Sequence, residues 1–155
     1  MKKFLFISIA ALFILNTGCL KSSECKPQSV QSEEGTITTY AAANGITSIR
    51  HSSGIYYQII NPGSGVTPTL GSKIFVTYTG KLLNGTIFDQ QANSSQTGFF
   101  LSQMISGWQI GIPLIQKGGE IKLIIPSSLA YGCTANGPIP ANSVLYFDVV
   151  LVDVQ

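Results

Sequence analysis

The sequence predicts an α+β domain in which a curved antiparallel sheet wraps around one short helix. Four segments rich in β-branched and aromatic residues indicate strands, whereas the second half of the chain holds one segment with helical character. Of the 155 residues, 45% are hydrophobic and 10% are charged, which is typical of a folded domain. Residues 1–18 and 19–52 differ in character from the remainder, so we place the domain at residues 53–155.

The predicted strands occupy residues 55–60, 73–79, 120–125 and 144–154. The first strand stops at an Asn-Pro-Gly turn signal, and the third stops at Pro126. The second and fourth alternate with a period of two, which predicts that one side of each faces the core. The residues expected on that side are Ile74, Val76, Tyr78, Leu145, Phe147, Val149 and Leu151.

Helical character is weaker and local. Residues 107–116 favour a helix, but Pro113 removes a backbone donor inside it at a cost of about 3 kcal/mol. We therefore expect this helix to be short or distorted. Residues 37–44 predict a second short helix closed by Gly45, and we interpret the polar, aperiodic residues 20–36 as a spacer.

Residues 1–18 have the pattern of an export signal. Lys2 and Lys3 form a positive start, and the apolar stretch Phe4–Leu15 is shorter than the roughly 20 residues that span a bilayer. Small residues then lead into Cys19, and this context resembles the lipobox of bacterial lipoproteins, whose cysteine is acylated. The alternative is an ordinary cleaved signal peptide followed by an incidental cysteine.

From the leader we expect an exported chain that a lipid on Cys19 tethers to a membrane of the bacterial cell envelope. The domain would then lie in the periplasm or at the outer membrane.

The formal charge of +2 comes from this leader. Lys2 and Lys3 are two of the nine basic residues, so the remaining seven balance the seven acidic ones. A neutral chain without a cluster of Lys and Arg does not match the phosphates of nucleic acid, and we expect no such partner. The low charge suits an extended or apolar polypeptide instead.

The cysteine count is odd for an exported chain. Three cysteines leave one unpaired unless one has another use. If Cys19 takes a lipid, Cys25 and Cys133 remain, and an oxidising compartment favours a disulfide between them. Two free thiols are the alternative, because sequence spacing does not determine whether two sulfur atoms meet.

A series of motifs resembles the FKBP family of prolyl isomerases over roughly residues 53–155. The motifs are VTYTG (76–80), LLNGTIFD (82–89), ISGW (105–108), IPSSLAYG (125–132) and LYFDVVLVDV (145–154). Each motif is weak alone, whereas their order and spacing together are specific. The resemblance implies a sheet of five to six antiparallel strands around a short helix, with an aromatic basin that holds a proline ring.

The resemblance also implies which residues form the basin. The residues expected to take part in catalysis are Tyr78, Phe88, Asp89, Trp108, Tyr131 and Phe147, and those expected to bind substrate are Phe99, Met104, Ile105 and Ile139. By the same resemblance, Trp108 is the floor of the basin. The backbone N–H of Ile105 and the hydroxyl of Tyr131 bind substrate carbonyls, and Asp89 orders its neighbours by hydrogen bonding.

Such a basin suits the isomerisation of X-Pro bonds, because a pocket that favours the twisted amide over both planar forms needs no nucleophile. His51, the one histidine, lies outside the motifs, and the sequence indicates no metal site and no cofactor. The expected partners are proline-containing, unfolded or extended polypeptides, and the resemblance adds macrolide inhibitors. The alternatives are a proline-peptide-binding or chaperone-like lipoprotein with little turnover, and a structural lipoprotein with a degenerate pocket.

Overall fold

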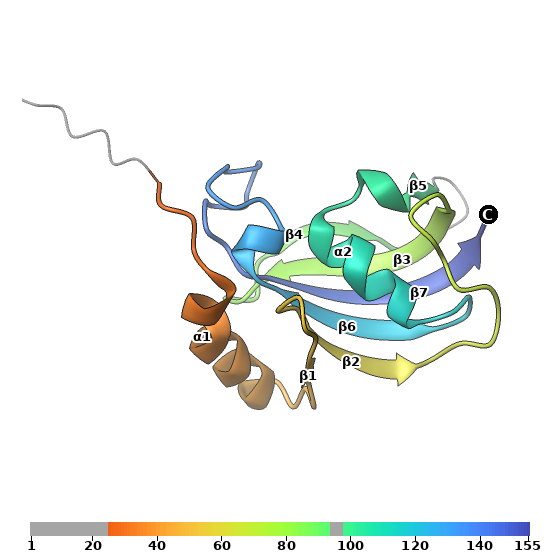
Figure 1. Ribbon diagram of the computed structural model, residues 1–155, viewed down its shortest axis with the longest axis horizontal. Coiled ribbons are helices and arrows are strands. Elements are labelled where there is room, and N and C mark those ends of the chain that lie inside the picture. Colours follow the sequence, from red (N-terminus) through yellow and green to blue (C-terminus); the bar gives the residue numbers. More distant parts are fainter. Residues whose placement is uncertain (1–24, 94–97) are drawn as a thin grey trace, which may run out of the picture.

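The computed structural model describes residues 25–93 and 98–155, and in these ranges seven antiparallel strands form one curved sheet (Figure 1). The sheet wraps around helix α2 (Ser106–Gly111), so the predicted fold class is confirmed. The strand order is β1-β2-β6-β7-β3-β4, with β5 paired to β3. The strands are β1 (Ile49–Arg50), β2 (Tyr56–Asn61), β3 (Lys73–Leu82), β4 (Ile87–Gln91), β5 (Phe99–Phe100), β6 (Glu120–Ile125) and β7 (Leu145–Val154).

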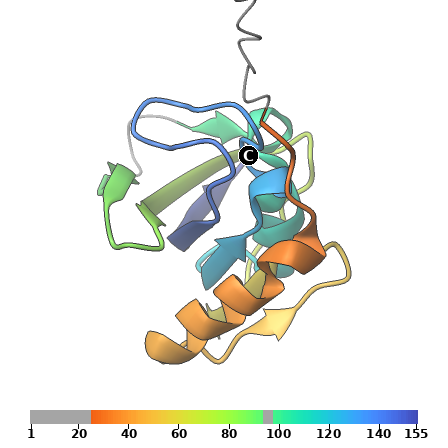
Figure 2. The same cartoon turned by 90° about the vertical axis from the view of Figure 1, so that its left-hand side faces the viewer.

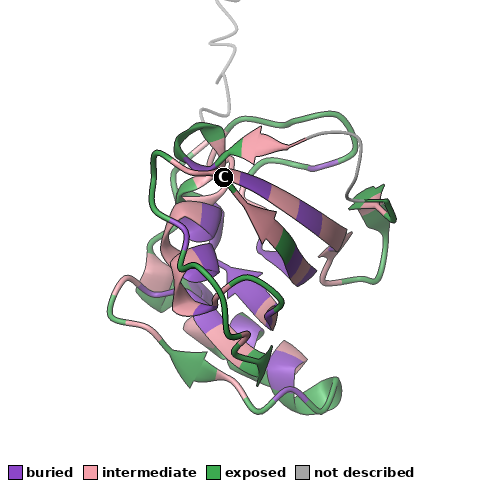
Figure 3. Cartoon of the chain, turned by 90° about the vertical axis from the view of Figure 1, so that its right-hand side faces the viewer, coloured by how far each residue is buried: buried purple, intermediate pink, exposed green. Residues whose placement is uncertain are grey.

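The two ten-residue strands β3 and β7 form the centre of the sheet and pair from Ile74↔Val154 to Leu82↔Leu145. Their alternation is the predicted one, since Ile74 and Val76 are fully buried. On β7 the core-facing residues, each at most 5% exposed, are Leu145, Phe147, Val149 and Leu151. Figure 3 shows this alternation as bands of buried residues along the strands.

The helix on the concave side of the sheet is short, as Pro113 predicts. Helix α2 ends at Gly111 and passes into a single 3-10 turn, η2 (Ile112–Leu114), that contains the proline. Because Pro113 has no N–H to donate, regular α-helical bonding does not continue past this point. The segment buries Trp108 and Ile112 against the sheet.

The N-terminal helix is longer than the sequence predicts. Helix α1 (Val30–Ala43) has 14 residues, so the prediction of a spacer over residues 20–36 is wrong from Val30 onward. The Ser29 side chain accepts a hydrogen bond from the Ser32 N–H and so caps the helix start. At the other end Gly45, with a φ of 64°, closes the helix in the predicted manner.

Helix α1 covers the opposite face of the sheet from α2, near one end (Figure 2). Its buried residues Ile37 and Ala41 join Ile46 in a second core. This core also contains Tyr56, Ile124 and Tyr146, which alternate along their strands with residues of the main core. The buried face of α1 is therefore narrow, and this explains its weak apolar pattern.

The export signal and Cys19 lie outside the described residues. Within the described ranges, no helix combines the length and apolar character that a bilayer span requires.

Candidate active site

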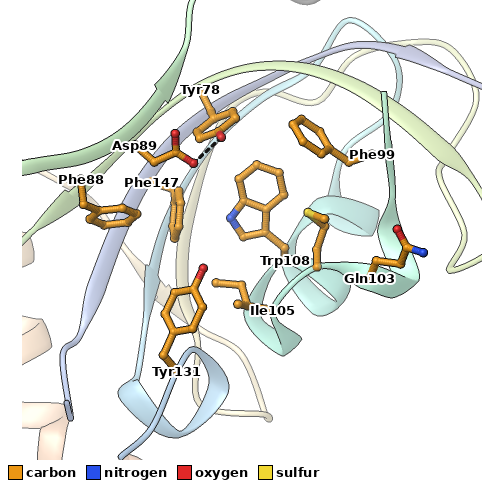
Figure 4. A pocket seen from close by; sticks show the side chains of 10 residues that line it. Tyr78, Phe88, Asp89, Phe99, Gln103, Ile105, Trp108, Tyr131 and Phe147 are labelled. Atoms are coloured by element: carbon orange, nitrogen blue, oxygen red, sulfur yellow. Dashed lines mark hydrogen bonds between the residues drawn. The ribbon is translucent and has the colours of Figure 1, made fainter. Parts of the chain in front are cut away.

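An open cavity of about 290 Å³ lies between α2 and the concave face of the sheet (Figure 4). Strands, helix and loops all contribute to it, so residues far apart in the sequence meet there. The lining residues are Tyr78, Phe88, Asp89, Phe99, Gln103, Met104, Ile105, Trp108, Tyr131 and Phe147. The cavity is thus walled mainly by aromatic and other apolar side chains, with a few polar groups.

The aromatic rings of the cavity pack edge to face. The ring of Trp108 is 5.2 Å from that of Tyr78 and 5.3 Å from that of Phe147, measured between centroids, and both pairs are T-shaped. Phe88 contacts Phe147 in the same way at 5.5 Å. This arrangement places the positive edge of one ring on the negative face of the next, which stabilises the pair beyond simple burial. Trp108 itself is 4% exposed.

Strands β3 and β4 contribute to this cluster at Gly80, where the backbone lies close to two of the aromatic rings. Gly80 of β3 pairs with Asp89 of β4, and the register between these strands shifts directly afterwards. A Cβ atom on Gly80 would lie 2.7 Å from the ring of Phe88 and 2.9 Å from that of Phe147. Glycine is therefore required at the end of the VTYTG motif, because a side chain there would displace both rings.

Tyr78 and Asp89 form the polar side of the cavity. The Tyr78 hydroxyl donates a hydrogen bond of 2.6 Å to Oδ2 of Asp89. Burial, together with this bond to a carboxylate, raises the pKa of Tyr78 well above its ordinary value of 10.0. Tyr78 therefore keeps its proton, and remains a donor, to a higher pH than an ordinary tyrosine does.

The rim beside Trp108 is held by a side chain of α2. The amide of Gln109 donates to the carbonyl of Met104 at 2.7 Å and to that of Ser102 at 3.2 Å. These bonds fix the turn η1 (Leu101–Gln103) and the two residues that follow it. The backbone of Ile105 is thereby positioned at the cavity wall.

Tyr131 reaches the cavity from the long connection between β6 and β7. It follows the turn η3 (Ser127–Leu129), and its hydroxyl points toward the rings of Phe147 and Trp108 (Figure 4). The Gly132 N–H donates to the carbonyl of Ser127 at 2.8 Å. The residue next to Tyr131 is thus tied back to the start of the connection.

The structure brings together all but one of the residues that the motifs place in the basin. Ile139 is 4% exposed and packs in the main core, and it does not line the cavity. Its backbone pairs with that of Asn136, which turns the loop there. Sequence reasoning missed Gln103, an exposed residue outside every motif, whose one signal is its position beside Met104.

Cys25 and Cys133 form a disulfide, with their Cα atoms 5.6 Å apart. The bond connects the segment before α1 to the residues just after Tyr131. The cysteine count left open a disulfide or two free thiols, and the structure has the disulfide.

An aromatic basin enclosed by a sheet and a short helix, with a few polar groups, is the kind of concave and mainly apolar pocket that binds small ligands or parts of larger ones. The comparisons with known proteins agree with this class. The family model described as FKBP-type peptidyl-prolyl cis-trans isomerase matches residues 65–152. More than half of the chain is matched, so the protein belongs to the FKBP-type peptidyl-prolyl cis-trans isomerase family.

Individual relatives carry the same description. The FKBP-type isomerase FkpA of Aeromonas hydrophila is 40% identical over 121 residues, which cover 75% of this chain and 44% of that protein. FkpA of Escherichia coli strain K12 is 42% identical over 105 residues, which cover 67% and 39%. The chain thus spans less than half the length of these curated relatives. The crystal structure of FkpA from Escherichia coli matches with a TM-score of 0.70 at 36% identity, over 81% of this chain and 61% of that one.

Proposed function

We propose that this chain catalyses cis–trans isomerisation of X-Pro bonds in unfolded or extended polypeptides. The main support is the cavity itself, in which family motifs from five parts of the chain meet around Trp108. Membership of the isomerase family supports the same reaction.

The aromatic walls suit the energetics of this reaction. Rotation about an X-Pro bond is opposed by amide resonance, with a barrier of about 18–20 kcal/mol. Twisting the bond localises the nitrogen lone pair and reduces the charge separation of the amide. A cavity of low polarity therefore favours the twisted form over either planar form, and that difference is what accelerates the reaction.

The polar groups at the rim would hold the substrate while the bond rotates. Tyr131 and Ile105 line the cavity, and their side chains lie near each other (Figure 4). The Tyr131 hydroxyl and the Ile105 N–H could bind carbonyls flanking the proline. Asp89 would act through Tyr78, from whose hydroxyl it accepts a hydrogen bond. Hydrogen bonds to the substrate on both sides of the X-Pro bond would hold that bond in the orientation needed for rotation.

The test is catalysis of X-Pro isomerisation in short peptides by the full-length chain in mild detergent, measured by NMR exchange. We expect Asp89→Asn to lower kcat/KM roughly tenfold, because the charged partner of Tyr78 is lost. Asp148→Asn is the matched control and should stay within about twofold. Asp148 also accepts a tyrosine hydroxyl, from Tyr146 at 3.3 Å, but it does not line the cavity.

A well-folded chain that binds proline peptides without accelerating their isomerisation would contradict the enzyme proposal and indicate a binding protein. Equal losses in Asp89→Asn and Asp148→Asn would contradict the assignment of the cavity as the site. Competition between a macrolide inhibitor and the peptide would support the same cavity, and the fluorescence of Trp108, the one tryptophan, offers a direct readout.

We further propose that the protein is an exported lipoprotein anchored through Cys19, with the domain in the periplasm or at the outer membrane. The apolar leader supports this location, and the disulfide fits an oxidising compartment. Mass spectrometry of the native N-terminal peptide should find acyl chains on Cys19. An unmodified Cys19 would contradict the proposal.

A further inference from the structure

Tyr131 lies outside the strands of the sheet, in the long connection between β6 and β7. Residues 126–144 connect β6 to β7, and their regular structure is limited to the turn η3 and one isolated bridge, Asn136↔Ile139. Residues 134–138, which follow closely after Tyr131, are all exposed. The position of the Tyr131 hydroxyl must therefore depend on contacts made by this connection with other parts of the chain.

The first such contact comes from helix α1. Glu33 is 7% exposed, and its Oε2 accepts a hydrogen bond of 2.8 Å from the N–H of Ser127. The carbonyl of Ser127 in turn accepts from the N–H groups of Ala130 at 3.0 Å and of Gly132 at 2.8 Å. A buried carboxylate thus holds the residue to which both neighbours of Tyr131 are bonded.

The second contact is the disulfide. Cys133, two residues after Tyr131, is bonded to Cys25. Asn142 completes the junction, because its side-chain amide donates to the carbonyl of Lys26 at 2.9 Å and its backbone N–H donates to the carbonyl of Gly132 at 2.7 Å. Both backbone polar groups of Gly132 are therefore engaged, one toward Ser127 and one toward Asn142.

We propose that residues 25–33 form a brace that positions Tyr131 for the isomerase reaction, with Cys25 and Glu33 as positioning residues. The brace contacts the connection before and after Tyr131, and Figures 1 and 2 show the N-terminal segment running beside that connection. The inference rests on the proposed function of the cavity. The brace gives a role to residues 25–33, which lie outside the residues 65–152 that the family model matches.

A double-mutant cycle in kcat/KM tests the brace on the full-length chain. The four proteins are the wild type, Tyr131→Phe, Cys25→Ser/Cys133→Ser, and the combination of all three substitutions. We expect removal of the disulfide to lower kcat/KM about threefold to tenfold when Tyr131 is present. In the Tyr131→Phe background the same removal should cost less than about twofold, because the positioned hydroxyl is already gone.

Glu33 and its neighbour Glu34 provide a matched pair. Glu33→Leu should lower kcat/KM as the loss of the disulfide does, whereas Glu33→Gln keeps an acceptor oxygen for the Ser127 N–H and should restore most of the activity. Glu34 instead accepts from the Tyr56 hydroxyl at 2.7 Å and lies 3.6 Å from Arg50. Glu34→Leu removes a carboxylate of the same helix and should leave kcat/KM unchanged.

Hydrogen exchange gives a readout that does not depend on activity. The amides of Gly132 and Asn142 should exchange about tenfold faster in Cys25→Ser/Cys133→Ser and in Glu33→Leu, because their bonds are part of the braced connection. Unchanged exchange, or equal losses of kcat/KM with and without Tyr131, would overturn the brace. A folded wild type without isomerase activity would instead overturn the proposed function. If the cysteine variant does not fold, the Glu33 and Glu34 variants decide the question.

Discussion

At the scale of single residues, two tyrosine–aspartate pairs lie on opposite faces of the sheet, one inside the cavity and one outside it. Tyr78 donates to Asp89 inside the cavity at 2.6 Å, and Tyr146 donates to Asp148 on the other face at 3.3 Å. Burial is the largest cause that raises the pKa of each tyrosine above its ordinary value of 10.0. Both hydroxyls therefore keep their protons where a free tyrosine would lose its own.

These raised pKa values predict how stability changes in alkali. A tyrosine in the unfolded chain ionises near pH 10, whereas Tyr78 and Tyr146 in the folded chain remain protonated to higher pH. The unfolded state then binds fewer protons, so the contribution of these two tyrosines to the free energy of unfolding should be constant below about pH 9 and fall above about pH 10. Urea unfolding at a series of pH values measures this fall. Tyr146→Phe should make the fall shallower, and an equally steep fall in that variant would mean that Tyr146 does not contribute to it.

The residues of the site differ in how far the sequence could predict them. The aromatic lining could be predicted because Tyr78, Trp108 and Phe147 each stand in an ordered motif. Ile139, which the resemblance implies for the basin, instead packs in the main core, and its loop has an isolated bridge to Asn136 that has no sequence signal. Gln103 reaches the cavity through the turn η1, a local geometry that residue type does not reveal.

At the scale of elements, the central strands were predictable and the edges were not. Strands β6 and β7 follow their predicted ranges closely, since apolar residues dominate both segments. Strand β4 lies at the end of the sheet order and exposes the apolar Ile87 beside the half-buried Phe88, so its sequence shows no alternation of apolar and polar residues. Helix α1 was predicted too short because its stability comes from docking on Tyr56 and Tyr146, and not from an apolar stripe.

Helix α1 also contains a residue that weakens it. Gly35 is exposed in the interior of the helix, and a Cβ atom added there would meet no atom within 4 Å. Gly35→Ala should raise the free energy of unfolding by about 0.5–1 kcal/mol, because glycine costs that much in a helix interior. Urea unfolding measures the change.

A glycine of α2 is the matched control for this prediction. A Cβ atom on Gly107 would overlap the side chain of Ile125, so Gly107→Ala should lower the free energy of unfolding even though the substitution is the same. A stability loss in Gly35→Ala, or a gain in Gly107→Ala, would contradict the packing of the two helices.

At the scale of the whole molecule, the structure has two cores on opposite faces of the sheet. The main core holds the cavity, and the second core holds α1 through Ile37 and Ala41. The disulfide adds a covalent connection between them, from the segment before α1 to the connection that carries Tyr131. The position of α1 in the folded state, and the freedom of the unfolded chain, both depend on this bond.

The length of chain that the disulfide closes predicts a large effect on stability. Cys25 and Cys133 are separated by 108 residues, and closing a loop of that size removes unfolded-state entropy worth up to about 5 kcal/mol. Cys25→Ser/Cys133→Ser should therefore lower the free energy of unfolding by about 2 to 5 kcal/mol, measured by urea unfolding of the oxidised proteins. The slope of the transition should rise, because an uncrosslinked chain exposes more surface when it unfolds. Reduction of the wild type should reproduce both changes, while reduction of the variant should change nothing. If the free energy of unfolding fell by less than about 1 kcal/mol and the denaturant slope stayed the same, the prediction would be wrong. The unfolded chain would then be about as compact without the disulfide as with it.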